Sequence, residues 1–190
     1  TMQTCGERPP GGMAAVMKLP TEEVERIAAT FDSIYPVNYN CPGQIACAGT
    51  AGEIDAFCDA VKAAGGRAVK LAVSGAFHTP FMADTTDALR RHLSTLSPSA
   101  PKIPLYSDFT ADLYPTDAEK IAETIAEQAS RSVRWETIIR RMADAGIDTF
   151  IEVGAGTTLS KLVSRTLTDV QILHVENAET LRETLAALGK

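Results

Sequence analysis

The first part of the chain alternates short apolar runs with amphipathic stretches. The run GMAAVMKL at 12–19 has the length and composition of a strand. The stretch that follows, 20–32, carries Val24, Ile27 and Phe31 at the spacing of one helix face. A proline at its start and acidic residues in its first turn are typical of a helix N-terminus. This pattern predicts a strand followed by a helix.

The next residues repeat that order with one extra strand. Two β-prone runs within 35–49 flank Cys-Pro-Gly, a turn signal, and predict a hairpin. Residues 50–66 carry apolar side chains at helical spacing up to a Gly-Gly stop, and 67–74 has the composition of a strand. The order β-α-β-β-α-β predicts a ferredoxin-like small subdomain over 12–74. Residues 1–11, which mix proline, glycine and charge, predict a linker.

Beyond residue 75 the pattern changes to helices that alternate with single strands. The expected helices are 79–96, 116–129, 135–146, 157–167 and 178–189, and the expected strands are 102–108, 149–154 and 171–176. The run at 149–154 is almost continuously β-prone, which indicates a buried parallel strand. The pattern predicts an α/β arrangement over 75–190. Three strands are few for so many helices, so we expect further strands to come from before Thr1.

Composition and charge exclude several classes of partner. The chain has 190 residues, 45% of them hydrophobic, a formal net charge of −6 and a pI near 5.1. An acidic protein does not attract nucleic acid or an anionic membrane surface. No apolar run approaches the about 20 residues that span a bilayer, and the first residues contain no apolar signal-peptide region. We therefore expect a cytoplasmic protein with no nucleic acid and no membrane partner.

The cysteines indicate neither disulfides nor metal. Cys5, Cys41, Cys47 and Cys58 show no C-x-x-C or Cys/His spacing, so reduced thiols are expected. Cys47 and Cys58 fall on predicted strand and helix faces that suit small buried apolar groups. The sequence predicts no metal and no bound cofactor.

His78 is the first candidate for chemistry. It follows a predicted strand and precedes Thr79-Pro80, which is typical of a helix start. A neutral imidazole is the usual general base near pH 7, but it needs a nucleophile in reach and an acceptor on its other nitrogen. A capping or hydrogen-bonding role is an alternative for His78. His92 lies inside a predicted helix and His174 inside a predicted strand, which favours structural roles for both.

A nucleophile is harder to find. No G-x-S-x-G occurs in the chain, and that motif exposes a serine at a strand-to-helix turn of an α/β sheet. Ser99 and Lys102 fit S-x-x-K, but Pro101 prevents the helix that would place the lysine over the serine. The glycine turn at 153–161 could hold an anion, yet it lacks the known phosphate-loop spacings, which favours a structural turn.

Four separated motifs together resemble one family. PVNYNCPGQIACAG at 36–49, SGAFHTPFM at 74–82, SVRWE at 132–136 and FIEVGAGTTLSKL at 150–162 resemble malonyl-CoA:acyl-carrier-protein transacylases and the related acyltransferase domains of fatty-acid and polyketide synthases. The motifs occur in the family's order over nearly the whole chain. The resemblance implies an α/β fold in which a ferredoxin-like subdomain is inserted into a larger α/β-hydrolase-like subdomain. Residues 75–190 would then be the C-terminal portion of the larger one.

The resemblance also implies a reaction and its base. The family's serine takes malonyl from malonyl-CoA, a coenzyme A thioester, and passes it to the phosphopantetheine thiol of acyl carrier protein. His78 matches the histidine that activates the serine. In the family a backbone carbonyl orients this ring, and here that position falls at Gln128, seven residues before Trp135. This carbonyl would fix the tautomer in place of an aspartate, although it stabilises an imidazolium less strongly, and it explains why the chain shows no obvious triad acid.

Other positions match residues around the family's cleft. Phe77 matches the aromatic residue that precedes the histidine in malonyl-selective members, and its alternative role is ordinary core packing. Asn38, Asn40 and Gln44 match a polar segment near the cleft. The resemblance leaves open whether these three side chains touch substrate or hold the hairpin.

Several family residues precede the region that matches. The serine in G-H-S-x-G, a glutamine of the oxyanion hole and an arginine that binds the malonyl carboxylate find no counterpart in this sequence. We therefore expect the C-terminal part of a transacylase that is inactive alone. The alternative is a non-catalytic module, derived from an acyltransferase, that binds a partner or a thioester.

Overall fold

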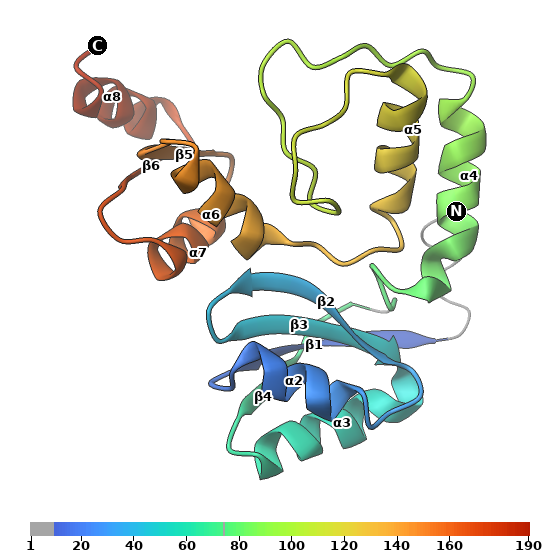
Figure 1. Ribbon diagram of the computed structural model, residues 1–190. Coiled ribbons are helices and arrows are strands. Elements are labelled where there is room, and N and C mark those ends of the chain that lie inside the picture. The colour runs from blue at the N-terminus through green and yellow to red at the C-terminus, as the bar shows by residue number, and fades with distance from the viewer. Residues whose placement is uncertain (1–9, 74) are drawn as a thin grey trace. The chain divides into compact units, whose positions relative to one another are not determined.

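The computed structural model describes residues 10–73 and 75–190, and these residues divide into two compact units, one that ends at Trp135 and one over Glu136–Lys190. Each unit is described by itself (Figure 1). The linker predicted over 1–11 lies mostly outside the described residues, and Gly11 already belongs to the first strand. The subdomain boundary predicted at 74/75 lies inside the first unit and stays a prediction.

The first unit is built on one antiparallel sheet. Its four strands are β1 (Gly11–Met17), β2 (Ile34–Cys41), β3 (Gln44–Thr50) and β4 (Arg67–Lys70), in the spatial order β2-β3-β1-β4. Helix α2 (Thr21–Ala28) joins β1 to β2, and α3 (Ala51–Ala63) joins β3 to β4. The predicted order of elements is therefore the observed one.

The last strand of this sheet is shorter than predicted. Strand β4 ends at Lys70, opposite Ala14, instead of continuing to residue 74. Beyond it, Leu71 donates one more hydrogen bond to Met13 O (2.9 Å), and the chain then reaches Gly11 through Ala76. A Cβ atom on Gly11 would lie 2.5 Å from the Ala76 nitrogen, so this close approach requires glycine.

Helices α2 and α3 cover one face of the sheet (Figure 1). Alternation along β1 and β3 directs Ala14, Val16, Ile45 and Cys47 to that face, where they are buried with the apolar faces of both helices. Phe57 is fully buried in this cluster, and its ring meets that of Phe31 edge to face at 5.9 Å. The predicted small core is therefore observed, and Cys47 and Cys58 are buried in it.

A short segment closes the opposite face. Met13, Val37, Ala46 and Ala48 are buried there against Ala76. The partly buried side chains that pack on this cluster are Tyr35, Phe77 and Phe81. Residues 76–81, which include His78, therefore pack on this face of the sheet. We call this segment the histidine corner.

Two helices complete the first unit. The predicted helix 79–96 begins as a 3-10 turn, η1 (Pro80–Met82), and continues as α4 (Ala83–Leu93). Helix α4 packs beside α5 (Ala118–Glu127) (Figure 1). Among the residues that the structure describes, no helix is long and apolar enough to cross a membrane.

The strand predicted over 102–108 is wrong. The segment forms one isolated bridge, between Tyr106 and Leu113, and Ile103 is 76% exposed. Pro101 and Pro104 lack the N–H that a sheet ladder needs, and no strand of the described residues pairs with this segment.

The second unit is a small α/β arrangement. It contains α6 (Trp135–Asp144) from its second residue on, β5 (Thr149–Val153), α7 (Thr158–Thr166), β6 (Gln171–Val175) and α8 (Ala178–Ala187). Strands β5 and β6 pair in parallel, as the pattern predicts. The prediction that β5 is buried is wrong, because Ile151 is exposed and Val153 is 78% exposed. A parallel strand is buried only when neighbouring strands and helices cover it, and β5 has one described strand beside it.

Candidate active site at His78

The corner at His78 is built by its neighbours. His78 has φ of 61°, a left-handed conformation that costs most residues about 1–2 kcal/mol. The buried hydroxyl of Thr79 donates to Ala76 O (2.6 Å) and accepts from Phe81 N (3.3 Å). Pro80 then fixes the first position of η1. These contacts hold His78 in the strained conformation and set the direction of its ring.

The hydrogen bonds of the ring determine its tautomer. Nδ1 lies 2.9 Å from the backbone carbonyl oxygen of Gln128 and 3.2 Å from that of Arg131. A carbonyl oxygen only accepts, so Nδ1 must carry the proton. In the neutral ring the lone pair is then on Nε2, which is the nitrogen able to accept a proton.

The carbonyl of Gln128 lies at the end of a helix. Gln128 is the C-cap of α5, where carbonyls lack intrahelical partners and the helix dipole is negative. Its side chain is also held: Oε1 accepts from Ser107 Oγ (3.1 Å) and from Tyr114 Oη (2.6 Å). Burial raises the pKa of Tyr114, so its hydroxyl stays protonated and able to donate. This network fixes the residue whose carbonyl meets His78.

The segment after Gln128 is attached to the edge of the sheet. Tyr39 N donates to Val133 O (2.9 Å), and Val133 N donates to Val37 O (2.7 Å). Ser132 Oγ donates to Pro36 O (2.9 Å). Edge strand β2 therefore positions the backbone that carries both carbonyls.

Asp108 lies against the same segment, and the sequence reasoning missed it. Its carbonyl oxygen accepts from Arg134 N (2.7 Å), and its Oδ1 is buried with no hydrogen bond among the described residues. Burial raises the pKa of Asp108, while attraction to His78 lowers it. The only signal in the sequence was a polar Ser-Asp pair at the end of the predicted strand 102–108.

The other predicted site residues lie at different places. Phe77 precedes His78 and is partly buried on the face of the sheet opposite to α2 and α3, which we call the second face. Asn38, in β2, pairs with Ala46 of β3 and forms an isolated bridge with Val133. Asn40 falls at a register shift near the end of β2. Contact of these side chains with substrate remains a prediction.

Gln44 lies farther from the corner. It pairs with Met17, six residues along β1 from Gly11, which is roughly 20 Å of strand. Its role at the cleft also remains a prediction.

The surroundings of Cys47 and of the glycine turn at 153–161 favour structural roles. Burial raises the pKa of Cys47 to about 12, so its thiol is not ionised near neutral pH. In the glycine turn, Leu159 N and Ser160 N donate to the carboxylate of Glu152 (3.0 and 2.7 Å). Gly156 N donates to Glu176 (3.2 Å). The protein's own carboxylates therefore occupy donors that an anion would need.

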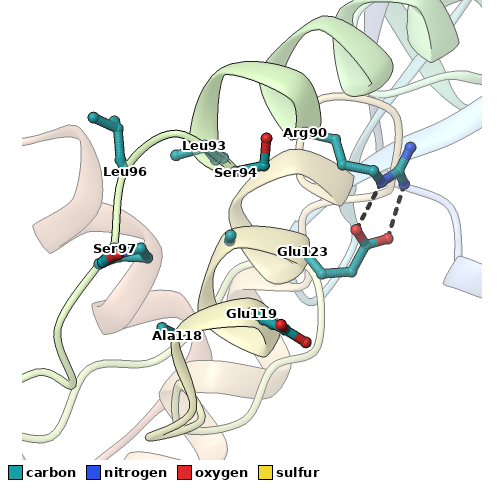
Figure 2. Close-up of a pocket in the computed structure, with 10 residues that line it drawn as sticks. Arg90, Leu93, Ser94, Leu96, Ser97, Ala118, Glu119 and Glu123 are labelled. Carbon is teal, nitrogen blue, oxygen red and sulfur yellow. Dashed lines mark hydrogen bonds and ion pairs between the residues drawn. The ribbon is translucent and has the colours of Figure 1, made fainter.

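The first unit carries two hollows near its helices. One, of about 510 Å³, lies between the end of α4 and the start of α5 (Figure 2). Leu93 and Leu96 line it, and the Arg90–Glu123 ion pair borders it, but it contains no predicted site residue. The second, of about 240 Å³, is lined by Pro80 and Arg131, which adjoin the histidine corner. Neither hollow is lined by a predicted site residue, and the second adjoins the histidine corner only through Pro80 and Arg131.

Comparison with known proteins identifies the family. The acyl transferase domain family matches residues 2–185. The malonyl CoA-acyl carrier protein transacylase of Bacillus subtilis is 31% identical over 183 residues, which are 94% of this chain and 57% of that protein. The chain thus spans little more than half the length of this relative.

Solved structures agree in fold. The malonyl CoA-acyl carrier protein transacylase from Clostridium perfringens is 31% identical, with a TM-score of 0.93 over 99% of this chain and 60% of that one. A malonyl-transacylase in complex with its type II PKS acyl-carrier protein is 27% identical, with a TM-score of 0.93 over 98% of this chain and 61% of that one. The α/β fold and the matched residues lead to one conclusion: this chain belongs to the acyl transferase domain family.

Proposed function

We propose that this chain supplies the general base for transfer of a malonyl group from malonyl-CoA to the phosphopantetheine thiol of an acyl carrier protein. One observation carries the proposal: in a member of the acyl transferase family, His78 Nδ1 is held at the Gln128 carbonyl (2.9 Å) and Nε2 is left to accept a proton. Two relatives named above act on, or are bound to, an acyl carrier protein, which supports that partner.

The proposed function includes a finer description of the fold. The unit β1-α2-β2-β3-α3-β4 is the ferredoxin-like small subdomain, and residues 75–190 are the C-terminal portion of an α/β-hydrolase-like large subdomain. The antiparallel strand order β2-β3-β1-β4 and the parallel pair β5-β6 support this division.

The first half of the reaction forms an ester. His78 Nε2 accepts the proton of a serine hydroxyl as the serine oxygen attacks the thioester carbonyl of malonyl-CoA. Nδ1–H remains bonded to Gln128 O, so the ring keeps its orientation while it becomes an imidazolium. The imidazolium then gives its proton to the coenzyme A sulfur as the C–S bond breaks, which leaves a malonyl-serine ester.

The second half reverses these steps with a new thiol. Nε2 accepts the proton of the phosphopantetheine thiol as its sulfur attacks the ester, and the proton returns to the serine oxygen when the C–O bond breaks. The 190 residues contain no G-x-S-x-G. We assign the serine to the part of the relatives' length that this chain does not cover.

Phe77 is proposed to favour malonyl over methylmalonyl. Its ring lies beside His78 and packs on the second face of the sheet, where it limits the space for an α-methyl branch. One methyl group changes selectivity by about 10- to 200-fold in an apolar pocket. In the complete enzyme, Phe77→Ser should lower the malonyl-to-methylmalonyl ratio of kcat/KM by about tenfold. The control Phe81→Ser changes a second aromatic residue on the same face and should leave the ratio unchanged.

Intact-mass spectrometry with malonyl-CoA tests the assignment of base and nucleophile. The chain alone should gain no malonyl group. The chain combined with a polypeptide that carries the relatives' N-terminal part should gain one and lose it when acyl carrier protein is added. A malonyl adduct on the chain alone would contradict the assignment of the serine. No adduct in the combined protein would favour the non-catalytic binding module.

A further inference from the structure

We propose that Asp108 is the anionic partner of the protonated His78 ring, a positioning residue that stabilises the imidazolium formed during proton transfer. The catalytic meaning of this inference rests on the proposed function, but the pairing of the two side chains does not. The carbonyl of Gln128 orients the ring without a full negative charge, and Asp108 supplies that charge.

The two residues lie against the same backbone segment. His78 Nδ1 contacts the carbonyl oxygens of Gln128 and Arg131, and Arg134 N donates to Asp108 O (2.7 Å). The residue before Asp108 is tied to that segment as well, because Ser107 Oγ donates to Gln128 Oε1 (3.1 Å). Residues 128–134 therefore hold the aspartate and the histidine in one small region.

The carboxylate of Asp108 is poorly compensated by other groups. Oδ1 is buried and has no hydrogen bond among the residues that the structure describes. Burial raises the pKa of Asp108, and the attraction of His78 is the largest effect that opposes it. The backbone N–H groups of Phe109 and Asp108 act in the same direction as His78. A half-buried carboxylate that gains from a nearby cation should equally stabilise that cation.

The other charged and titratable groups near Asp108 and His78 have other partners or are exposed to water. Arg131 places its guanidinium over the Phe109 ring (5.9 Å) and pairs with Glu127 (2.7 Å). Tyr114 donates its hydroxyl to Gln128, and the charge of Asp108 contributes to the raised pKa of this phenol. Arg134 is exposed, so water screens its charge. His78 is therefore the cation for which Asp108 is the available counter-charge.

Carbon-13 NMR titration of the Asp108 carboxyl group in the full chain tests the pairing directly. The resonance is assigned by its loss in Asp108→Asn. The test variant is His78→Asn, because asparagine tolerates the left-handed backbone at this corner. The matched control is His92→Asn, the same change at an exposed position of α4.

The outcomes are distinct. Attraction to His78 lowers the pKa of Asp108, so His78→Asn should raise the Asp108 midpoint and His92→Asn should not. An unchanged midpoint in His78→Asn overturns the pairing. An Asp108 carboxyl that is still protonated at neutral pH in the unaltered protein overturns it too.

A second readout separates this inference from the proposed function. In the complete enzyme, Asp108→Asn should lower kcat/KM for malonyl transfer by about tenfold, since the charge that stabilises the imidazolium is lost while the base remains. A shifted Asp108 midpoint with unchanged transfer would keep the pairing and remove its catalytic role. Full transfer by His78→Asn would instead remove the proposed function of His78 and leave the NMR result standing.

Discussion

The two faces of the four-stranded sheet are closed in different ways. Helices α2 and α3, which are close in sequence to the strands they cover, bury one face around Phe57 and Cys47. The opposite face is closed by residues 76–81, and its edge pairs with Val133, far along the chain. Among the described residues, the first face contains none of the predicted site residues. The second carries the histidine corner.

The second face holds a residue in a strained backbone conformation, and the helix-covered face does not supply the contacts that fix it. The left-handed conformation of His78 costs free energy and persists only where neighbouring contacts fix it. Those contacts come from the second face, through Ala76 against Gly11 and the buried Thr79 hydroxyl. Changes on the helix-covered face should therefore affect stability most, and changes on the second face should affect both stability and the site.

The largest effect on stability is expected at the centre of the helix-covered face. Phe57→Ala removes a fully buried ring and leaves a cavity, so the free energy of unfolding should fall by about 3–5 kcal/mol. Urea unfolding measures this change. Val153→Ala, at an exposed position of β5, is the control and should change the value by less than about 0.5 kcal/mol. Equal losses in both variants would show that the loss at Phe57 does not come from its burial in this core.

A smaller effect is expected where the second face approaches β1. Gly11→Ala places a Cβ atom 2.5 Å from the Ala76 nitrogen, so the backbone must shift at a cost of about 1–3 kcal/mol. In Gly12→Ala the new Cβ would meet Ile54 at an ordinary 3.6 Å, and stability should stay the same or rise slightly. The two variants are compared by thermal unfolding. If Gly11→Ala is as stable as Gly12→Ala, the close approach is not needed.

A third effect, which develops only above about pH 8.5, is a pH dependence of the helix-covered face. Burial raises the pKa of Cys47 to about 12, against about 8.5 for a free thiol. The folded state keeps the neutral thiol, so its contribution is complete below about pH 8.5 and is lost as pH rises towards 12. The slope should be at most about 1.4 kcal/mol per pH unit. Urea unfolding from pH 8 to about 10.5 should give a flatter profile for Cys47→Ala than for the unaltered protein.

The elements that form the helix-covered face could be predicted from the local sequence pattern. Apolar residues at helical spacing, glycine stops and alternating strands predict β1 to β4 and both helices, because each pairing joins elements that are near in sequence. The strand predicted over 102–108 failed for the opposite reason. A β-prone composition is not a strand until another strand pairs with it, and Ile103 has none in the described chain.

The histidine corner depended on more than local pattern. Residue types alone left His78 as either a base or a capping residue, and the family resemblance supplied Gln128 as its partner. The distance between His78 and the Gln128 carbonyl is now given by the structure, whereas their catalytic roles stay a proposal. Asp108 could not be found from the sequence, because a lone aspartate after an expected strand does not show which distant side chain it faces.

Malonyl transfer by the complete enzyme is the measurement that tests the central claim most directly. The rate of transfer from malonyl-CoA to acyl carrier protein is compared between the unaltered protein and His78→Asn, with His92→Asn as the matched control. If His78 is the base, His78→Asn should reduce kcat/KM by about 10³-fold while the protein unfolds at a similar urea concentration. The control should stay within about twofold, because a surface change away from the reaction removes no transition-state contact. Near-normal transfer by a folded His78→Asn protein would contradict the account.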